Sequence, residues 1–213
     1  MKEELSGGQR HRVLVDLQHR PGGRHPHPHT AVDGTPPMSV PFVTVRPFTI
    51  FREGGSMGAS GWDYITRYDG DVEAALGTLQ ASVFQEEYGD GTRYRSLQDL
   101  YADEEFMGTE GTHTILDVDR VVATDAPPRQ SSITDYNTLR PLALSRVMHH
   151  FGTGRPTVEQ YEKLVAAANK AASHEEHERS LLAECQMRWT GCYIVLYSDD
   201  RPTHLGIFGF SGD

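Results

Sequence analysis

Two kinds of feature are scarce in this chain, and each scarcity excludes a class of protein. Its 213 residues include only two cysteines, Cys185 and Cys192, too few for the disulfide framework of a small secreted domain. It has no apolar run of about 18 residues, the length that spans a bilayer, and its first residues lack the apolar core of a signal peptide. We therefore expect a cytoplasmic protein without a membrane partner, and we interpret both cysteines as small buried side chains rather than a redox pair.

Positive charge is also scarce. The chain has 20 Lys and Arg residues against 30 Asp and Glu residues, a formal net charge of -10. Nucleic acids and anionic membrane surfaces bind through basic faces, so this acidic balance argues against either as a general partner. An unknown small molecule or another protein is the expected partner.

Residues 1–39 differ in composition from the rest of the chain. The stretch 20–30 is dense in proline, glycine and histidine and has almost no large apolar side chain, so it cannot bury enough surface to offset the entropy lost on ordering. We predict a disordered tail over residues 1–39 and a single domain over residues 40–213. Met38 lies where the composition changes and is an alternative start to Met1.

Two motifs in this tail suggest chemistry but lack the context that it needs. Leu5 to Gln9 reads Leu-Ser-Gly-Gly-Gln and resembles the signature motif of ABC-transporter ATPases, but a phosphate-binding G-x-x-x-x-G-K-[ST] loop is absent from the sequence, so we interpret the match as chance. His25, His27 and His29 alternate with prolines and could bind a transition metal, but no scaffold surrounds them. We predict no metal site, and the sequence identifies no cofactor.

The densest apolar stretch lies near the end of the chain. Cys192 to Tyr197 is short and rich in β-branched and aromatic residues, which favours a buried strand. The polar connection 198–203 suits a turn, and Leu205 to Phe210 returns as a second strand. We expect this hairpin to be the buried centre of the fold.

Apolar periodicity predicts the elements around this hairpin. Strands are expected at 42–51 (broken at Pro47), Trp62–Tyr68 and Thr112–Val122, and helices at 71–88, 96–107, 138–150, 157–172 and 173–188. This irregular order predicts an α+β fold: a mainly antiparallel sheet of four to six strands with helices packed on one face.

Four blocks of the sequence carry a resemblance. They are Tyr68–Leu76, Gly111–Val118, Phe151–Thr153 with Pro156 and Thr157, and the Tyr193–Phe210 hairpin. Together they resemble a group of small uncharacterised actinobacterial proteins. The resemblance implies a bacterial protein with one domain that begins near residue 40, and it implies no activity.

The side chains best suited to catalysis are His113, Asp117, Tyr64 and Arg67. Tyr64 and Arg67 lie on an expected strand beside the glycine-rich 54–61 loop, and such loops can enclose a ligand. Asp117-Val118-Asp119 resembles the metal–nucleotide-sugar motif of glycosyltransferases, but alternation along a strand would place both carboxylates on the solvent face.

The sequence shows no complete catalytic set. The leading hypothesis is therefore a non-catalytic binding or accessory protein with a regulatory, self-protection or biosynthetic helper role. The alternative is a small transferase or hydrolase with a site among the Gly54–Gly61 loop, the Trp62–Tyr68 strand and His113. A deep pocket that joins His113 or an aspartate to Tyr64 or Arg67 is expected of the enzyme.

Overall fold

A computed structural model of the chain describes residues 44–48 and 61–212. Several sequence predictions therefore lie outside the described residues. They are the disordered tail, the domain boundary near residue 40, the motifs at Leu5 and at His25 to His29, and residues 54–60 of the glycine-rich loop.

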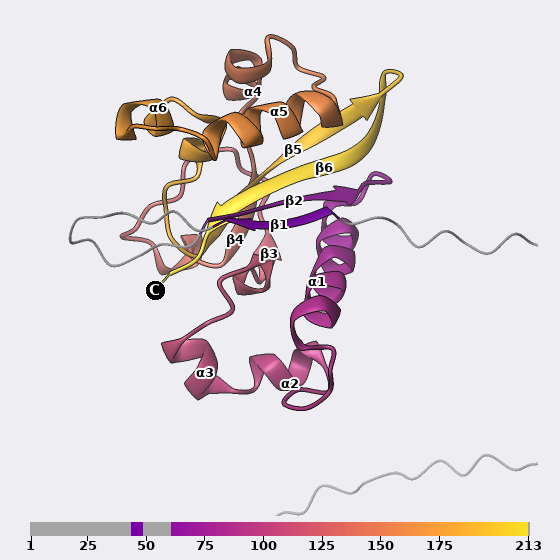
Figure 1. The fold of residues 1–213 in the computed structure, drawn as a ribbon, viewed down its shortest axis with the longest axis vertical. Helices are drawn as coiled ribbons and strands as arrows, with labels where there is room; N and C mark the ends of the chain where they lie inside the picture. Colours follow the sequence, from indigo (N-terminus) through magenta and orange to yellow (C-terminus); the bar gives the residue numbers. More distant parts are fainter. Residues whose placement is uncertain (1–43, 49–60, 213) are drawn as a thin grey trace, which may run out of the picture. The chain divides into compact units, whose positions relative to one another are not determined.

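In the part of the chain that the structure describes, six strands form one sheet (Figure 1). They are β1 (Thr44–Phe48), β2 (Gly61–Arg67), β3 (Arg120–Val121), β4 (Thr138–Pro141), β5 (Thr190–Ser198) and β6 (Arg201–Phe210), in the order β1-β2-β6-β5-β4-β3. The pairings among β1, β2, β6 and β5 are antiparallel, whereas β4 and β3 add in parallel to β5. The fold is α+β as predicted, but the sheet is mixed rather than mainly antiparallel. β1 also runs through Pro47, where a break was expected.

Most α-helices of the described ranges begin at a residue whose side chain caps the first turn. The helices are α1 (Val72–Tyr88), α2 (Leu97–Tyr101), α3 (Glu104–Thr109), α4 (Leu144–Phe151), α5 (Val158–Ala168) and α6 (His174–Glu178), with 3₁₀ turns η1 (Ile115–Asp117), η2 (Ile133–Asp135) and η3 (Leu181–Glu184). Five of these six α-helices have such a cap, whereas α4 begins after Ala143 without one. The Asp71 side chain accepts a hydrogen bond from the backbone N–H of Ala74 at the start of α1, and Thr157 forms a capping box with Gln160 at the start of α5.

Two expected elements are of a different kind in the structure. The helix predicted over 138–150 begins only at Leu144, because 138–141 is strand β4; Pro141 disfavours helical geometry at the residue before it. The strand predicted over 112–122 is mostly a loop, with η1 and the two-residue β3.

Two expected helices are interrupted. The helix predicted over 96–107 divides into α2 and α3, because the Asp103 side chain caps a new turn by accepting from the N–H of Phe106. The helix predicted over 173–188 ends at Glu178, and η3 follows it. This break places Leu181 and Leu182 in the core, each 1% exposed.

The sheet is covered on both faces, which corrects the expectation of helices on one face. Alternate residues of a strand point to opposite faces, and neighbouring Ile207 and Phe208 of β6 are both fully buried. Ile207 belongs to a first core with α1, α2, α3 and η1, and Phe208 to a second core with α5 and η3. Figure 1 shows α4, α5 and α6 on one side of the sheet and α1 on the other.

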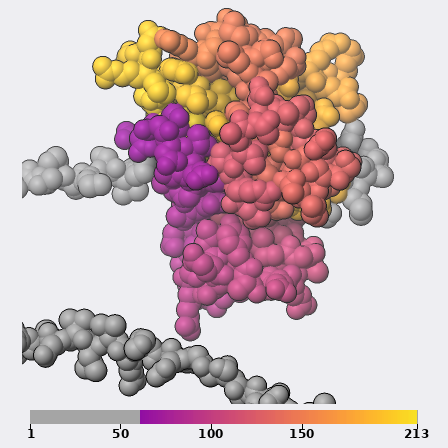
Figure 2. Space-filling model, turned by 180° about the vertical axis from the view of Figure 1, so that it is seen from behind, coloured from indigo at the N-terminus to yellow at the C-terminus, as the bar shows by residue number. Residues whose placement is uncertain are grey.

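The carboxy-terminal hairpin is the buried centre, as its sequence predicts. β6 lies between β2 and β5, and its apolar residues belong to both cores. The space-filling view from behind shows α2 and α3 (magenta) gathered at one end and the orange and yellow carboxy-terminal segments at the other (Figure 2). None of the helices in the described ranges is long and apolar enough to cross a membrane.

Candidate functional site

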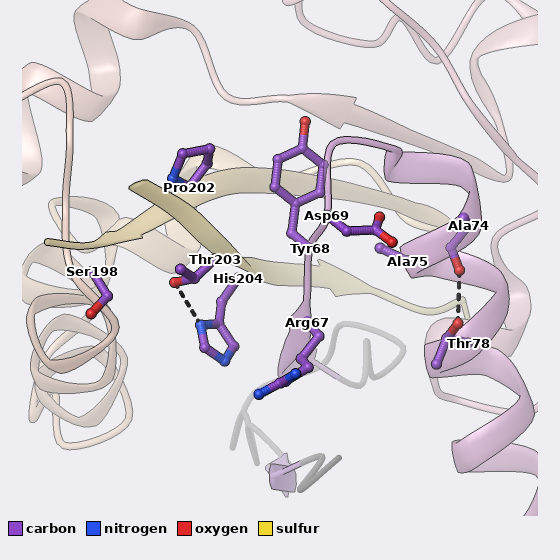
Figure 3. Close-up of a pocket in the computed structure, with 10 residues that line it drawn as sticks. All are labelled: Arg67, Tyr68, Asp69, Ala74, Ala75, Thr78, Ser198, Pro202, Thr203 and His204. Atoms are coloured by element: carbon purple, nitrogen blue, oxygen red, sulfur yellow. Dashed lines mark hydrogen bonds between the residues drawn. The ribbon is translucent and has the colours of Figure 1, made fainter. Parts of the chain in front are cut away.

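A pocket of about 500 Å³ lies where β2 ends, next to the start of β6 and the first turns of α1. Three segments line it (Figure 3). They are the end of β2 and the residues that follow it (Arg67, Tyr68 and Asp69), helix α1 (Ala74, Ala75 and Thr78) and the β5–β6 hairpin (Ser198, Pro202, Thr203 and His204). The first residues of β6 extend beyond the core, since residues 201–204 are exposed or half-buried and residues 205–209 are buried. The end of the central hairpin therefore presents polar side chains to the pocket.

Arg67 and His204 form one side of this pocket. They are register partners on antiparallel β2 and β6, so their side chains leave the same face of the sheet. Figure 3 shows both side chains below the strands in that view and Tyr68 extending to the opposite side. The pocket thus wraps around the end of β2, with a basic side and a side made by Tyr68, Asp69 and α1.

The electrostatics of the basic side come from one fixed charge and one titratable group. Burial, with a smaller contribution from the Arg67 guanidinium, lowers the pKa of His204 below its usual value, so its imidazole is neutral near neutral pH. The Thr203 hydroxyl lies 2.9 Å from Nδ1 of His204. Arg67 is exposed, and the ion pairs of the described residues do not include it. A cationic guanidinium and a neutral imidazole therefore stand side by side.

Among the four side chains singled out from the sequence, Arg67 is the one that lines this pocket. Tyr64 is 1% exposed, and burial raises its pKa. His113 is half-buried in the loop before η1, with a left-handed φ of 54°. Tyr64 belongs to the same core as Ile115 and Leu116, which lie between His113 and Asp117 in the chain.

Asp117 holds this loop together. Its Oδ1 accepts hydrogen bonds from the Thr112 backbone N–H at 3.1 Å and the Thr112 hydroxyl at 2.6 Å. The carboxylate is buried, whereas Asp119 is exposed, so the expectation that both aspartates face solvent is wrong for Asp117. The reason is that η1 replaces the expected strand and turns Asp117 inward toward Thr112.

Sequence reasoning missed His204, Thr203 and Asp69 as site residues. The sequence offers only a weak indication of them, because Thr203 and His204 are simply polar residues at the start of an otherwise apolar strand. The pairing of His204 with Arg67 depends on the β2–β6 register, which joins segments far apart in the chain and cannot be inferred from local pattern.

The described residues contain no group of three or more His, Cys, Asp or Glu side chains placed to hold a metal ion. In the comparisons with known proteins, no family model, curated protein or solved structure matches the chain significantly. A function for this chain must therefore be inferred from the chemistry of the pocket itself.

Proposed function

We propose that this chain is a non-catalytic binding protein whose pocket takes a small anionic ligand, a carboxylate or an oxyanion such as phosphate or sulfate. The observation that carries the proposal is the Arg67–His204 pair on one side of a pocket of about 500 Å³. Guanidinium groups bind planar or tetrahedral anions through paired N–H donors, and the neighbouring imidazole adds a further donor.

The rest of the lining suits the remainder of such a ligand. Tyr68, Ala74 and Pro202 supply apolar surface, and Thr78 and Ser198 supply hydroxyl groups. The pocket falls within the range of about 300–1,000 Å³ that is typical of small-molecule sites. These features favour a small organic anion over a macromolecule.

The alternative, a small transferase or hydrolase, has one observation in its favour. Thr203 Oγ1 lies within hydrogen-bond distance of His204 Nδ1, as a nucleophile and its base do. However, the hydrogen bonds of the described residues give His204 no carboxylate partner, the third group that orients the base in such sites. An enzyme was expected to bring Tyr64 or Arg67 together with His113 or Asp117. Tyr64 is buried in the first core, Asp117 holds the loop before η1, and Arg67 lines the pocket. Binding without turnover is therefore favoured.

Arg67→Ala is expected to weaken anion binding about 10- to 100-fold, because a charge-assisted hydrogen bond contributes about 1.5–3 kcal/mol. Isothermal titration calorimetry with sulfate, phosphate and benzoate measures this. Arg95→Ala is the matched control, since Arg95 is an exposed arginine outside the pocket and its loss changes net charge equally. Equal weakening in both variants would show that general charge, rather than the pocket, attracts the anion. Consumption of a ligand during titration would instead support the enzyme.

Binding of sulfate is expected to tighten as pH falls, by up to about tenfold per pH unit near the pKa of His204. The sign follows because the pKa of His204 is lowered in the free protein and a bound anion favours the charged imidazolium, so binding takes up a proton. Sulfate does not itself titrate over this range. Titrations between about pH 5 and pH 8 measure the slope, and His204→Gln should flatten it. An unchanged slope in His204→Gln would remove His204 from the site.

A further inference from the structure

The two cysteines of the chain meet in the second core. Cys185 directly follows η3 and is 2% exposed, and Cys192 lies on β5 and is 6% exposed. Both belong to the second core, and the Cys185 sulfur lies 3.3 Å from the carbonyl oxygen of Thr190, which precedes Cys192 by two residues on β5. Because the chain has no other cysteine, this arrangement places all of its thiol groups in one part of the core.

A buried positive charge lies beside the pair. Arg140 is 3% exposed and is the register partner of Cys192 on neighbouring β4. Its guanidinium donates to the carbonyl of Ala126 at 2.6 Å and to the hydroxyl of Thr138 at 3.0 Å, and these contacts hold it on the cysteine side of the strand. A fixed cation near a thiol favours the thiolate, the reactive form of cysteine.

The two thiols are not equivalent. The Cys185 sulfur lies 3.3 Å from the carbonyl oxygen and 3.5 Å from the hydroxyl of Thr190. The neighbouring Cys192 thiol lowers the pKa of Cys185, and Thr190 and Arg140 lower it further against the effect of burial. The neighbouring Cys185 thiol, together with burial, raises the pKa of Cys192. Cys185 is therefore the thiol that ionises first.

We propose that Cys185 and Cys192 are a modification site that closes reversibly into an intramolecular disulfide when the protein meets a peroxide. In the first step the Cys185 thiolate attacks one oxygen of hydrogen peroxide, the O–O bond breaks, and the leaving hydroxide takes the proton lost by the thiol to form water. Cys185 is then a sulfenic acid. In the second step the Cys192 sulfur attacks the Cys185 sulfur, the S–O bond breaks, and the departing hydroxide takes the Cys192 proton as a second water. The two thiols lose two electrons in total, and the peroxide gains them.

The bond would tie η3 to β5 across the short connection 186–191. Because both thiols are buried, the oxidant reaches them through local opening of this connection. The connection includes Trp189, which has a left-handed φ of 53° and is 37% exposed, a conformation that costs free energy for a bulky residue. Closing the loop restricts the unfolded chain and raises the melting temperature, by about 5 °C for a loop of this length and a chain of this size.

The test uses the native full chain. It is treated with hydrogen peroxide, unfolded in the presence of an alkylating reagent and weighed intact by mass spectrometry. The expected result is a monomer lighter by about 2 Da that takes up no alkyl group, regains both thiols with dithiothreitol and melts at a higher temperature. Two alkylated thiols after treatment, or covalent dimers alone, would overturn the proposal.

The order of attack is tested with single variants and dimedone, a reagent for sulfenic acids. Cys192→Ser should form a dimedone adduct at Cys185, whereas Cys185→Ser should leave Cys192 unmodified at the same peroxide dose. If either variant does not fold, early dimedone trapping in the unaltered chain followed by peptide mapping gives the same information. An adduct mainly at Cys192 would overturn the role given to Cys185.

Discussion

Replacing Gly209 with valine is expected to lower the free energy of unfolding by about 3 kcal/mol or more, enough to unfold a domain of ordinary stability under mild conditions. A Cβ at Gly209 would lie 2.4 Å from the backbone oxygen of Thr190 and 2.4 Å from the ring of Trp62. The Thr190 oxygen belongs to β5, whose ladder with β6 would have to shift. Trp62 is 1% exposed and donates to the Ser211 hydroxyl at 3.1 Å, so it has no free space to enter.

The matched control for this prediction is Gly77→Ala. Gly77 is exposed in the middle of α1, and a Cβ there would meet no atom within 4 Å. Alanine is the better helix former, so this variant should gain about 0.5–1 kcal/mol. Urea denaturation followed by circular dichroism measures both variants. A Gly209→Val protein within about 1 kcal/mol of the unaltered chain would contradict the packing of Trp62 against the β5–β6 hairpin.

Asp117→Ala is expected to cost about 2–3 kcal/mol, because it leaves the buried N–H and hydroxyl of Thr112 without their acceptor. Asp117→Asn keeps a side-chain oxygen and should cost less. Chemical denaturation measures both, and sulfate binding at the pocket should stay unchanged. Loss of binding in a folded Asp117→Asn protein would contradict the purely structural role of this carboxylate.

Asp119→Asn is the matched control for Asp117. Asp119 is exposed, and the hydrogen bonds of the described residues do not give its side chain a buried partner. The variant should therefore be unchanged in stability, within about 0.5 kcal/mol. The two aspartates of one short motif thus differ in effect because only one is buried.

The sequence pattern predicts the centre of this fold well. The apolar runs at 192–197 and 205–210 identify the two central strands, since a strand buried on both faces is apolar at consecutive positions. Asp71 and Thr157 identify the starts of α1 and α5, because their side chains replace the missing acceptors of the first turn. These patterns depend only on residues that are close in the sequence, so they can be recognised without knowledge of the fold.

The features that the sequence does not reveal are the non-local ones. Strand β4 has only four residues, and it pairs in parallel with β5, a strand far away in the sequence. A segment this short, without a hairpin turn beside it, cannot be distinguished by its sequence pattern from the helix that follows. The inward turn of Asp117 depends on a hydrogen bond to Thr112 rather than on strand alternation. The pocket needs the β2–β6 register to place His204 beside Arg67, and that register is a property of the folded sheet.

The most direct test of the proposed site is the titration of the His204 side chain by NMR. The chain has 11 histidines, and the signal missing from His204→Gln identifies the one of interest. The expected result is a pKa below the usual value of about 6.5 in the free protein and an upward shift when sulfate is added, which Arg67→Ala abolishes. A His204 signal that titrates identically with and without sulfate, phosphate and benzoate would contradict an anion-binding pocket at this end of the hairpin.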